Sequence, residues 1–226
     1  DGLNINMSLP EIHLATDGDL NYALFKHNDI VSNNVRAGGY ETELQQLSKE
    51  LLVGHTDGIV LDIGANLGSY TVPVAKAHPH LKVLSFEPQR IIYLQLCANL
   101  FLNRLDNVLP YQYALSDAEW QENLETPDYA TEHNIGAFSV DPIVRVKGYE
   151  VLTEGTPEMI HATMLDKFQF TNVRLIKIDV EGFEYDVLLG ATKTLETWNP
   201  VVQVEMVYGQ PHRFGHSVHD ILKFFE

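Results

Sequence analysis

The stretch IVLDIGANLGSYT, residues 59–71, decides the fold class of this chain. Its first five residues, Ile59–Ile63, form a short apolar run rich in β-branched side chains, which predicts a buried strand. Gly64 and Gly68 permit a tight turn, and a helix is expected to begin near Ser69 with its amides facing the turn. The spacing is G-A-N-x-G, so the G-x-G-x-x-G pattern of dinucleotide enzymes is not met.

The alternation of short apolar runs with helical stripes continues along the chain. Further buried strands are predicted at Lys82–Phe86, Val108–Leu115, Val173–Ile178 and Val201–Met206. Apolar residues recur at helical spacing within 40–51, 91–105, 185–195 and 218–225. Ser217 and Asp220 resemble the capping box of the last helix. This order predicts a single α/β domain whose twisted, mostly parallel sheet has helices on both faces.

The N-terminal end and one internal stretch depart from this alternation. We expect residues 1–36 to form an N-terminal extension packed on the core, with edge strands at Ile12–Leu14 and Tyr22–Phe25, and residues 37–226 to form the main domain. Residues 117–161 are polar and rich in proline, so they are interpreted as a loop or hairpin excursion near the substrate side.

The composition excludes several classes of protein. The 226 residues contain 31 Asp plus Glu and 15 Lys plus Arg, which gives a formal charge of −16 and disfavours nucleic acid as the principal partner. The single cysteine, Cys97, cannot form an internal disulfide, which is typical of a reducing compartment. No run approaches the roughly 18 apolar residues of a membrane-spanning helix. We therefore expect a cytoplasmic protein that does not enter a membrane.

A carboxylate follows the second strand of the main domain. The sequence SFEP, residues 85–88, places Glu87 at the strand end, 87 − 68 = 19 residues after Gly68. A carboxylate near this spacing accepts hydrogen bonds from both hydroxyls of a ribose and repels the extra phosphate of NADP. The alternative is an exposed charge at a strand end.

Two more carboxylates follow the fourth strand, in LIKIDVEGFEYDVLLGA, residues 175–191. Asp179 ends the strand and Glu181 lies two residues further on, on the same side if the chain stays extended. They could act as a base, as metal ligands or as partners of a cationic cosubstrate. Lys177 lies two residues before Asp179 and so on the same face of the strand, and a structural ion pair is therefore the alternative.

Together these motifs resemble the FkbM family of S-adenosylmethionine-dependent methyltransferases. The resemblance is carried by residues 60–71, SFEP, YALSD at 113–117 and the motif around DVEG, and it runs from about residue 30 to 206. It implies a Rossmann-like class I methyltransferase fold and O-methylation of a carbohydrate or small-metabolite hydroxyl. The family fold continues into two more strands after the last helix seen here. We therefore expect the natural protein to continue beyond Glu226, or a second subunit to cover the edge strand that ends at Met206.

The resemblance also implies roles for individual residues. The residues expected to bind S-adenosylmethionine are Asp62, Gly64, Ala65, Asn66, Gly68, Glu87, Pro88, Ala114, Leu115, Ser116 and Asp179. Asp62 would lie near the methionine amino group, Glu87 at the ribose, and Ala114 to Ser116 against adenine. The residues expected to face the reacting groups are Asp179, Glu181 and Glu205.

Two alternative functions stay open. An NAD-dependent oxidoreductase would also use Glu87, and a catalytically silent cofactor-binding module of a larger protein would share every motif. No metal site is assigned, although a divalent ion on Asp179 and a second acid would acidify a bound hydroxyl. His212, His216 and His219 have H-x3-H-x2-H spacing, but they lack the ligand set of a closed zinc site, and one of them could instead be a base.

Overall fold

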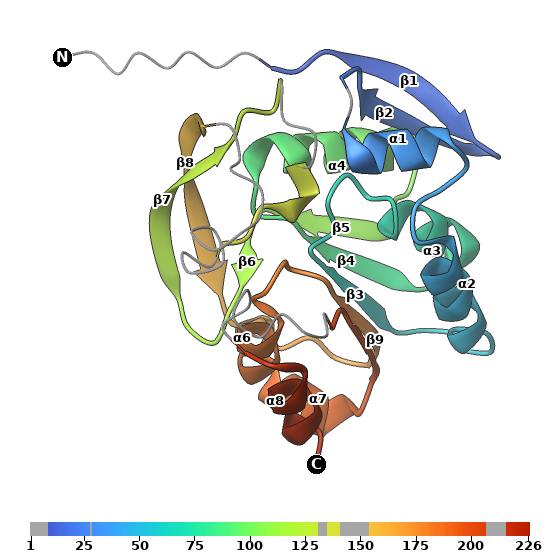
Figure 1. The fold of residues 1–226 in the computed structure, drawn as a ribbon. Helices are drawn as coiled ribbons and strands as arrows, with labels where there is room; N and C mark the ends of the chain where they lie inside the picture. Colours follow the sequence, from blue (N-terminus) through green and yellow to red (C-terminus); the bar gives the residue numbers. More distant parts are fainter. Residues whose placement is uncertain (1–8, 28, 131–134, 141–153, 207–215) are drawn as a thin grey trace.

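A five-stranded parallel sheet forms the centre of the computed structural model, which describes residues 9–27, 29–130, 135–140, 154–206 and 216–226 (Figure 1). Its strands are β3 (Ile59–Ile63), β4 (Lys82–Phe86), β5 (Val108–Tyr111), β9 (Val173–Ile178) and β10 (Val201–Val204). They lie in the order β10-β9-β3-β4-β5, all parallel. The strand order therefore reverses between β3 and β9, and ligands of open α/β sheets bind at the carboxyl ends beside such a reversal.

Alternate residues of these strands supply the two apolar faces of the sheet. Val60, Val83 and Leu175 face α2 (Thr42–Leu51), α3 (Thr71–Ala77) and α4 (Arg90–Leu102). Leu61 and Ile176 face the opposite way, toward α6 (Glu184–Leu189), α7 (Thr192–Trp198) and α8 (Val218–Phe224). Helices thus cover both faces, which confirms the predicted α/β class with its mostly parallel sheet (Figure 1).

A smaller sheet lies beside the carboxyl end of the central one (Figure 1). It consists of β6 (Ala114–Leu115), β7 (Trp120–Pro127) and β8 (Glu154–Thr163), in the order β6-β8-β7, with β7 and β8 antiparallel. Two 3-10 helices accompany it, η1 (Ile135–Ala137) and η2 (Leu165–Phe168). The stretch interpreted as a loop or hairpin excursion thus contributes two strands with a core of their own, which includes Leu124 and Ile160.

The N-terminal residues form a hairpin, β1 (Ile12–Asp17) with β2 (Leu20–Phe25), followed by α1 (Ile30–Arg36). Three polar side chains spaced by four on α4 bond to the backbone of β2. Gln95 donates to Ala23 O at 2.8 Å, Asn99 accepts from Ala23 N at 2.6 Å, and Asn103 accepts from Asn21 N at 2.8 Å. These three side chains therefore form the hydrogen bonds to the backbone of β2 that a neighbouring strand would otherwise form.

Two predicted elements are each divided in the structure. The run predicted as one strand over Val108–Leu115 forms β5 and β6 in different sheets, because β4 ends and β6 pairs with β8 instead. The stripe over 185–195 forms α6 and α7, which separate at Gly190, where an added Cβ would lie 1.9 Å from Ser116 O. Both divisions are set by neighbours that are distant in the sequence.

Smaller differences concern element ends. Helix α1 was not expected within the N-terminal extension, although Asp29 caps it by accepting from Ser32 N at 2.8 Å. Strand β10 ends at Val204, two residues earlier than predicted, and α3 begins at Thr71 rather than near Ser69. The capping box at Ser217 and Asp220 is confirmed.

Strand β10 lies at one edge of the central sheet, and among the described residues it pairs with β9 alone. The expectation that further strands or a second subunit cover this edge stays a prediction. None of the helices in the described part of the chain is long and apolar enough to cross a membrane.

The Asn99→Ala variant tests how α4 holds the hairpin. Asn99 is fully buried and also donates to Leu67 O at 2.7 Å, so its removal leaves the amide of Ala23 and the carbonyl of Leu67 without these partners. We expect the free energy of unfolding to fall by about 2 to 3 kcal/mol in urea denaturation followed by circular dichroism. The control is Gln46→Ala, which removes an exposed hydrogen bond to Glu50 and should cost less than about 0.5 kcal/mol. Equal losses for both variants would contradict this account.

Candidate functional site

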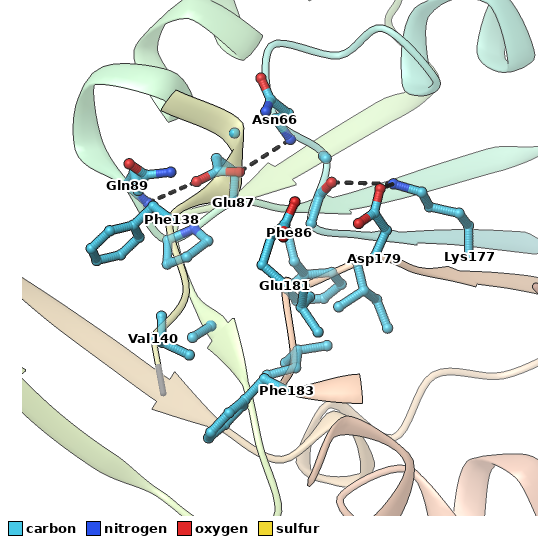
Figure 2. Close-up of a pocket in the computed structure, with 18 of the residues that line it drawn as sticks. Asn66, Phe86, Glu87, Gln89, Phe138, Val140, Lys177, Asp179, Glu181 and Phe183 are labelled. Carbon is cyan, nitrogen blue, oxygen red and sulfur yellow. Dashed lines mark hydrogen bonds and ion pairs between the residues drawn. The ribbon is translucent and has the colours of Figure 1, made fainter. Parts of the chain in front are cut away.

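A pocket opens where β3, β4 and β9 end, beside the reversal of strand order (Figure 2). It encloses about 860 Å³, part of which is open to solvent. Its lining combines the glycine turn, the ends of β4 and β9, the start of β6 and apolar residues from the excursion. The full lining is Val31, Tyr40, Glu41, Ile63, Gly64, Ala65, Asn66, Ser69, Phe86, Glu87, Pro88, Gln89, Tyr113, Ala114, Leu115, Gly136, Phe138, Val140, Lys177, Asp179, Val180, Glu181 and Phe183.

The turns after β3 and β9 touch at the floor of the pocket. Asp179 N donates to Ile63 O at 3.0 Å, which continues the pairing of the two strands. Gly64 has a φ of +81°, and a Cβ added to it would lie 1.8 Å from Asp179 O. Only glycine fits this position, because any side chain would separate the two turns.

Glu87 lies at the end of β4, where its carboxylate is 4% exposed. Its two oxygens accept from Asn66 N at 3.1 Å and Gln89 N at 2.9 Å, so the carboxylate joins the glycine turn to the start of α4 (Figure 2). Burial raises the pKa of Glu87 to about 7, although both backbone hydrogen bonds act in the opposite direction. Each oxygen keeps a second lone pair, so the carboxylate can still accept hydrogen bonds from a ligand.

Lys177 is the buried cation beside the pocket. Its amino group lies 3.1 Å from Asp179 Oδ2 (Figure 2). It also lies 3.6 Å from Asp62 Oδ1 and donates to Gly64 O at 3.3 Å. Burial alone lowers the pKa of Lys177, but Asp179, Asp62 and Glu41 raise it by more. Lys177 therefore stays charged, and it neutralises part of the acidic charge around it.

Three carboxylates gather at the ends of β9 and β10. Asp179, Glu181 and Glu205 each place an oxygen within 4.8 Å of the others. Loss of water around Glu205, followed by the charges of Asp179 and Glu184, raises the pKa of Glu205 to about 7. These are the oxygen ligands that divalent cations prefer, but Lys177 already occupies one side of Asp179, and we derive no step from a metal.

Most of the residues expected to bind a cofactor line this pocket. They are Gly64, Ala65, Asn66, Glu87, Pro88, Ala114, Leu115 and Asp179, and Glu181 lines it as well. Asp62, Gly68, Ser116 and Glu205 are not among the lining residues.

The residues outside the lining have other neighbours. Asp62 is fully buried, accepts a short hydrogen bond from Thr71 and pairs with Lys177, so it supports the floor from beneath. A Cβ on Gly68 would meet Leu96 Cδ1 at 2.9 Å, so its close approach is to α4 rather than to the pocket. Ser116 donates its amide to Thr163 O at 3.0 Å within the smaller sheet.

Several lining residues were not found from the sequence. Tyr40 and Glu41 precede α2, and Glu41 has a left-handed φ of 54°. Phe138 and Val140 come from the excursion, and Phe183 precedes α6. Phe183 lies within the motif at residues 175–191 but was assigned no role, and the excursion and the N-terminal elements reach the pocket only through tertiary packing.

The histidines do not form a common site in the described part of the chain. His212 lies outside the described residues. His216 contacts Glu184, with 3.3 Å between Nε2 and Oε2, and His219 is exposed on α8. Neither of these two lines the pocket.

Comparisons with known proteins place this geometry among methyltransferases. Residues 62–226 match the family model described as Methyltransferase FkbM domain. The chain is 27% identical over 214 residues to the AMB antimetabolite synthetase AmbE of Pseudomonas aeruginosa, a match that covers 82% of this chain and 10% of AmbE. It is 26% identical over 149 residues to the hexuronic acid methyltransferase AglP of Haloferax volcanii, covering 65% of this chain and 55% of AglP.

A solved structure, Methyltransferase FkbM from Methylobacillus flagellatus, has the same fold. It superposes with a TM-score of 0.50 at 15% sequence identity, over 76% of this chain and 38% of that one. The chain thus spans less than two thirds of the length of each of these proteins.

The Gly64→Ala variant tests the contact between the two turns. The new Cβ would overlap Asp179 O, so we expect the free energy of unfolding to fall by more than roughly 4 kcal/mol in urea denaturation. Gly18→Ala is the matched control, because Gly18 also has a positive φ, of 58°, but nothing within 4 Å, and it should cost only about 1 kcal/mol. If the two variants are equally stable, the turns can separate without cost and the floor of the pocket is not rigid.

Proposed function

The chain belongs to the methyltransferase FkbM family, and we propose that it transfers a methyl group from S-adenosylmethionine to a hydroxyl oxygen of a carbohydrate or small metabolite. One observation carries the proposal: a single pocket contains both Glu87 and the pair Asp179 and Glu181. The Glu87 carboxylate fits the hydroxyls of a ribose, and the carboxylates of Asp179 and Glu181 fit a reacting centre. Their backbones belong to different strand ends that meet at the reversal of strand order.

The pocket suits each part of the proposed cofactor. The Glu87 carboxylate can accept from the two ribose hydroxyls, and Ala114 and Leu115 offer an apolar wall for adenine. The turn at Gly64 and the Asp179 carboxylate would hold the methionine part. S-Adenosylmethionine supplies a methyl group on a positively charged sulfur, and Glu41, Asp179 and Glu181 make this end of the pocket acidic.

The protein must align the acceptor and take its proton. Glu205 is the proposed base: it does not line the pocket, but one of its oxygens lies within 4.8 Å of oxygens of Asp179 and Glu181, and its pKa of about 7 leaves it partly ionised at neutral pH. Phe138, Val140 and Phe183 give the pocket apolar walls, which would limit the access of water to the reacting groups. Orientation of the hydroxyl by these walls and carboxylates would supply most of the rate enhancement.

A neutral hydroxylated acceptor fits this end of the pocket. Carboxylates accept hydrogen bonds from hydroxyl groups, and the aromatic walls can pack against a sugar ring. The relative AglP is named a hexuronic acid methyltransferase, which supports the carbohydrate class of the acceptor but not its neutral charge, because a hexuronic acid carries a carboxylate.

A thermal-shift experiment separates the proposed cofactor from NAD. A ligand at 100 times its dissociation constant adds about 2.7 kcal/mol of stability, so S-adenosylmethionine should raise the melting temperature by about 5 to 10 °C, and NAD should not. Glu87→Ala should weaken binding by about 2 kcal/mol, or roughly 30-fold, because charge-assisted hydrogen bonds to both ribose hydroxyls are lost.

The control for this experiment is Glu122→Ala, which removes an exposed carboxylate from β7 and should leave the shift unchanged. A shift with NAD alone would favour an oxidoreductase. Binding of S-adenosylmethionine without methyl transfer to any hydroxyl acceptor would favour the silent binding module.

The pH dependence of methyl transfer tests Glu205 as the base. A base acts in its ionised form, so kcat at saturating cofactor should rise as the pH increases through about 7, the pKa of Glu205. Glu205→Gln should lower kcat by about 10²-fold or more and abolish this rise. A variant that keeps the same pH profile as the wild type would assign the proton to another group.

A further inference from the structure

The loop that carries Asp179 and Glu181 is held by a carboxylate that does not line the pocket. Glu184 is the first residue of α6 and is 3% exposed. Its Oε1 accepts from Val180 N and from Gly182 N, both at 3.1 Å. These amides lie on either side of Glu181, so one oxygen fixes the Asp179–Val180 and Glu181–Gly182 peptide groups.

The other oxygen of Glu184 contacts the C-terminal segment. His216 Nε2 lies 3.3 Å from Glu184 Oε2, and both side chains are less than one tenth exposed. The ring of His216 also packs against Tyr185, with 5.9 Å between centroids. His216 directly precedes Ser217, the capping residue of α8, so this contact joins the last helix to the loop.

The loop needs this support because its backbone is strained. Glu181 has a φ of 54°, a left-handed conformation that costs a non-glycine residue about 1 kcal/mol, and Gly182 follows with a φ of 101°. On its other side the loop is fixed by Asp179, which bonds to β3 through its amide and to Lys177 through its side chain. Between these two attachments, Glu181 has little freedom to turn away from the pocket.

We propose that Glu184 is a positioning residue for methyl transfer, which holds the carboxylates of Asp179 and Glu181 toward the pocket through the amides of Val180 and Gly182. His216 completes the arrangement by pairing with the second oxygen of Glu184, because a buried carboxylate is stable only with such partners. The proposal rests on the proposed function for what the two carboxylates do. The way in which Glu184 holds the loop is independent of the proposed function.

Two variants of Glu184 and one control test the proposal. Glu184→Ala removes the acceptor of both amides, and Glu184→Gln keeps an oxygen that can replace Oε1. Asp166→Ala is the matched control, because Asp166 accepts from Lys193 N at 2.9 Å and Thr194 N at 2.8 Å at the start of α7 and does not line the pocket. It should destabilise the protein without moving the loop.

The first measurement is hydrogen–deuterium exchange of the peptide that covers residues 178–184, in the protein without ligand. We expect exchange to be at least tenfold faster in Glu184→Ala, and unchanged in Glu184→Gln and Asp166→Ala. Unchanged exchange in Glu184→Ala would overturn the proposal. This measurement needs no enzymatic activity, so it decides how the loop is held even if the wild type does not transfer methyl groups.

The second measurement is kcat and KM at a temperature where all variants are folded. Misplaced catalytic groups cost up to about 10²-fold, so kcat of Glu184→Ala should fall by about tenfold to 100-fold with a smaller change in KM. Glu184→Gln should restore kcat to within about threefold of wild type, and Asp166→Ala should match wild type. Equal losses in Glu184→Ala and Asp166→Ala, or no rescue by Glu184→Gln, would show that Glu184 serves stability alone.

Discussion

The pocket depends on one buried amino group, that of Lys177, at the reversal of strand order. Asp62 and Lys177 are register partners on β3 and β9, and the ion pair between them crosses the centre of the sheet. Burial of Asp62 without this cation would raise its pKa further and leave a costly isolated charge. The same amino group contacts Asp179 and Gly64 O, so one interaction both stabilises the sheet and fixes two walls of the pocket.

This ion pair belongs to a polar row across the sheet. Gln203, Lys177, Asp62 and Ser85 are successive register partners on β10, β9, β3 and β4. Tyr70 extends the row to α2, because its hydroxyl contacts Gln203 Oε1 at 3.2 Å and donates to Ser48 at 2.8 Å. A polar network in an otherwise apolar face favours a single register of these four strands, and their ends present the residues of the pocket.

The sequence alone predicted the elements that are determined by their own residues rather than by distant contacts. Strands β3, β4 and β9 have the predicted bounds, because each is a buried apolar run between turns. The division between α6 and α7 was not predictable, since it depends on the close approach of Gly190 to Ser116 O. The sequence left two alternatives for Asp179, a structural ion pair with Lys177 or a functional site. In the structure both hold, because Asp179 pairs with Lys177 and also lines the pocket. The position of Asp62 beneath the floor follows from its partner on another strand, which no local pattern reveals.

The distribution of charge explains how a stable fold can keep an acidic pocket. Lys177 pairs with Asp62 and Asp179, and its charge also lowers the pKa values of Glu41 and Glu205, although burial raises both by more. Burial raises the pKa values of Glu87 and Glu205 most, and neighbouring carboxylates raise them further, so both groups are partly neutral near pH 7, which limits the repulsion within the pocket. A cation that enters the pocket relieves this repulsion, whereas a neutral product does not. The acidic pocket would therefore favour the charged form of the proposed cofactor over the form left after transfer, and the same electrostatics would help to release the product.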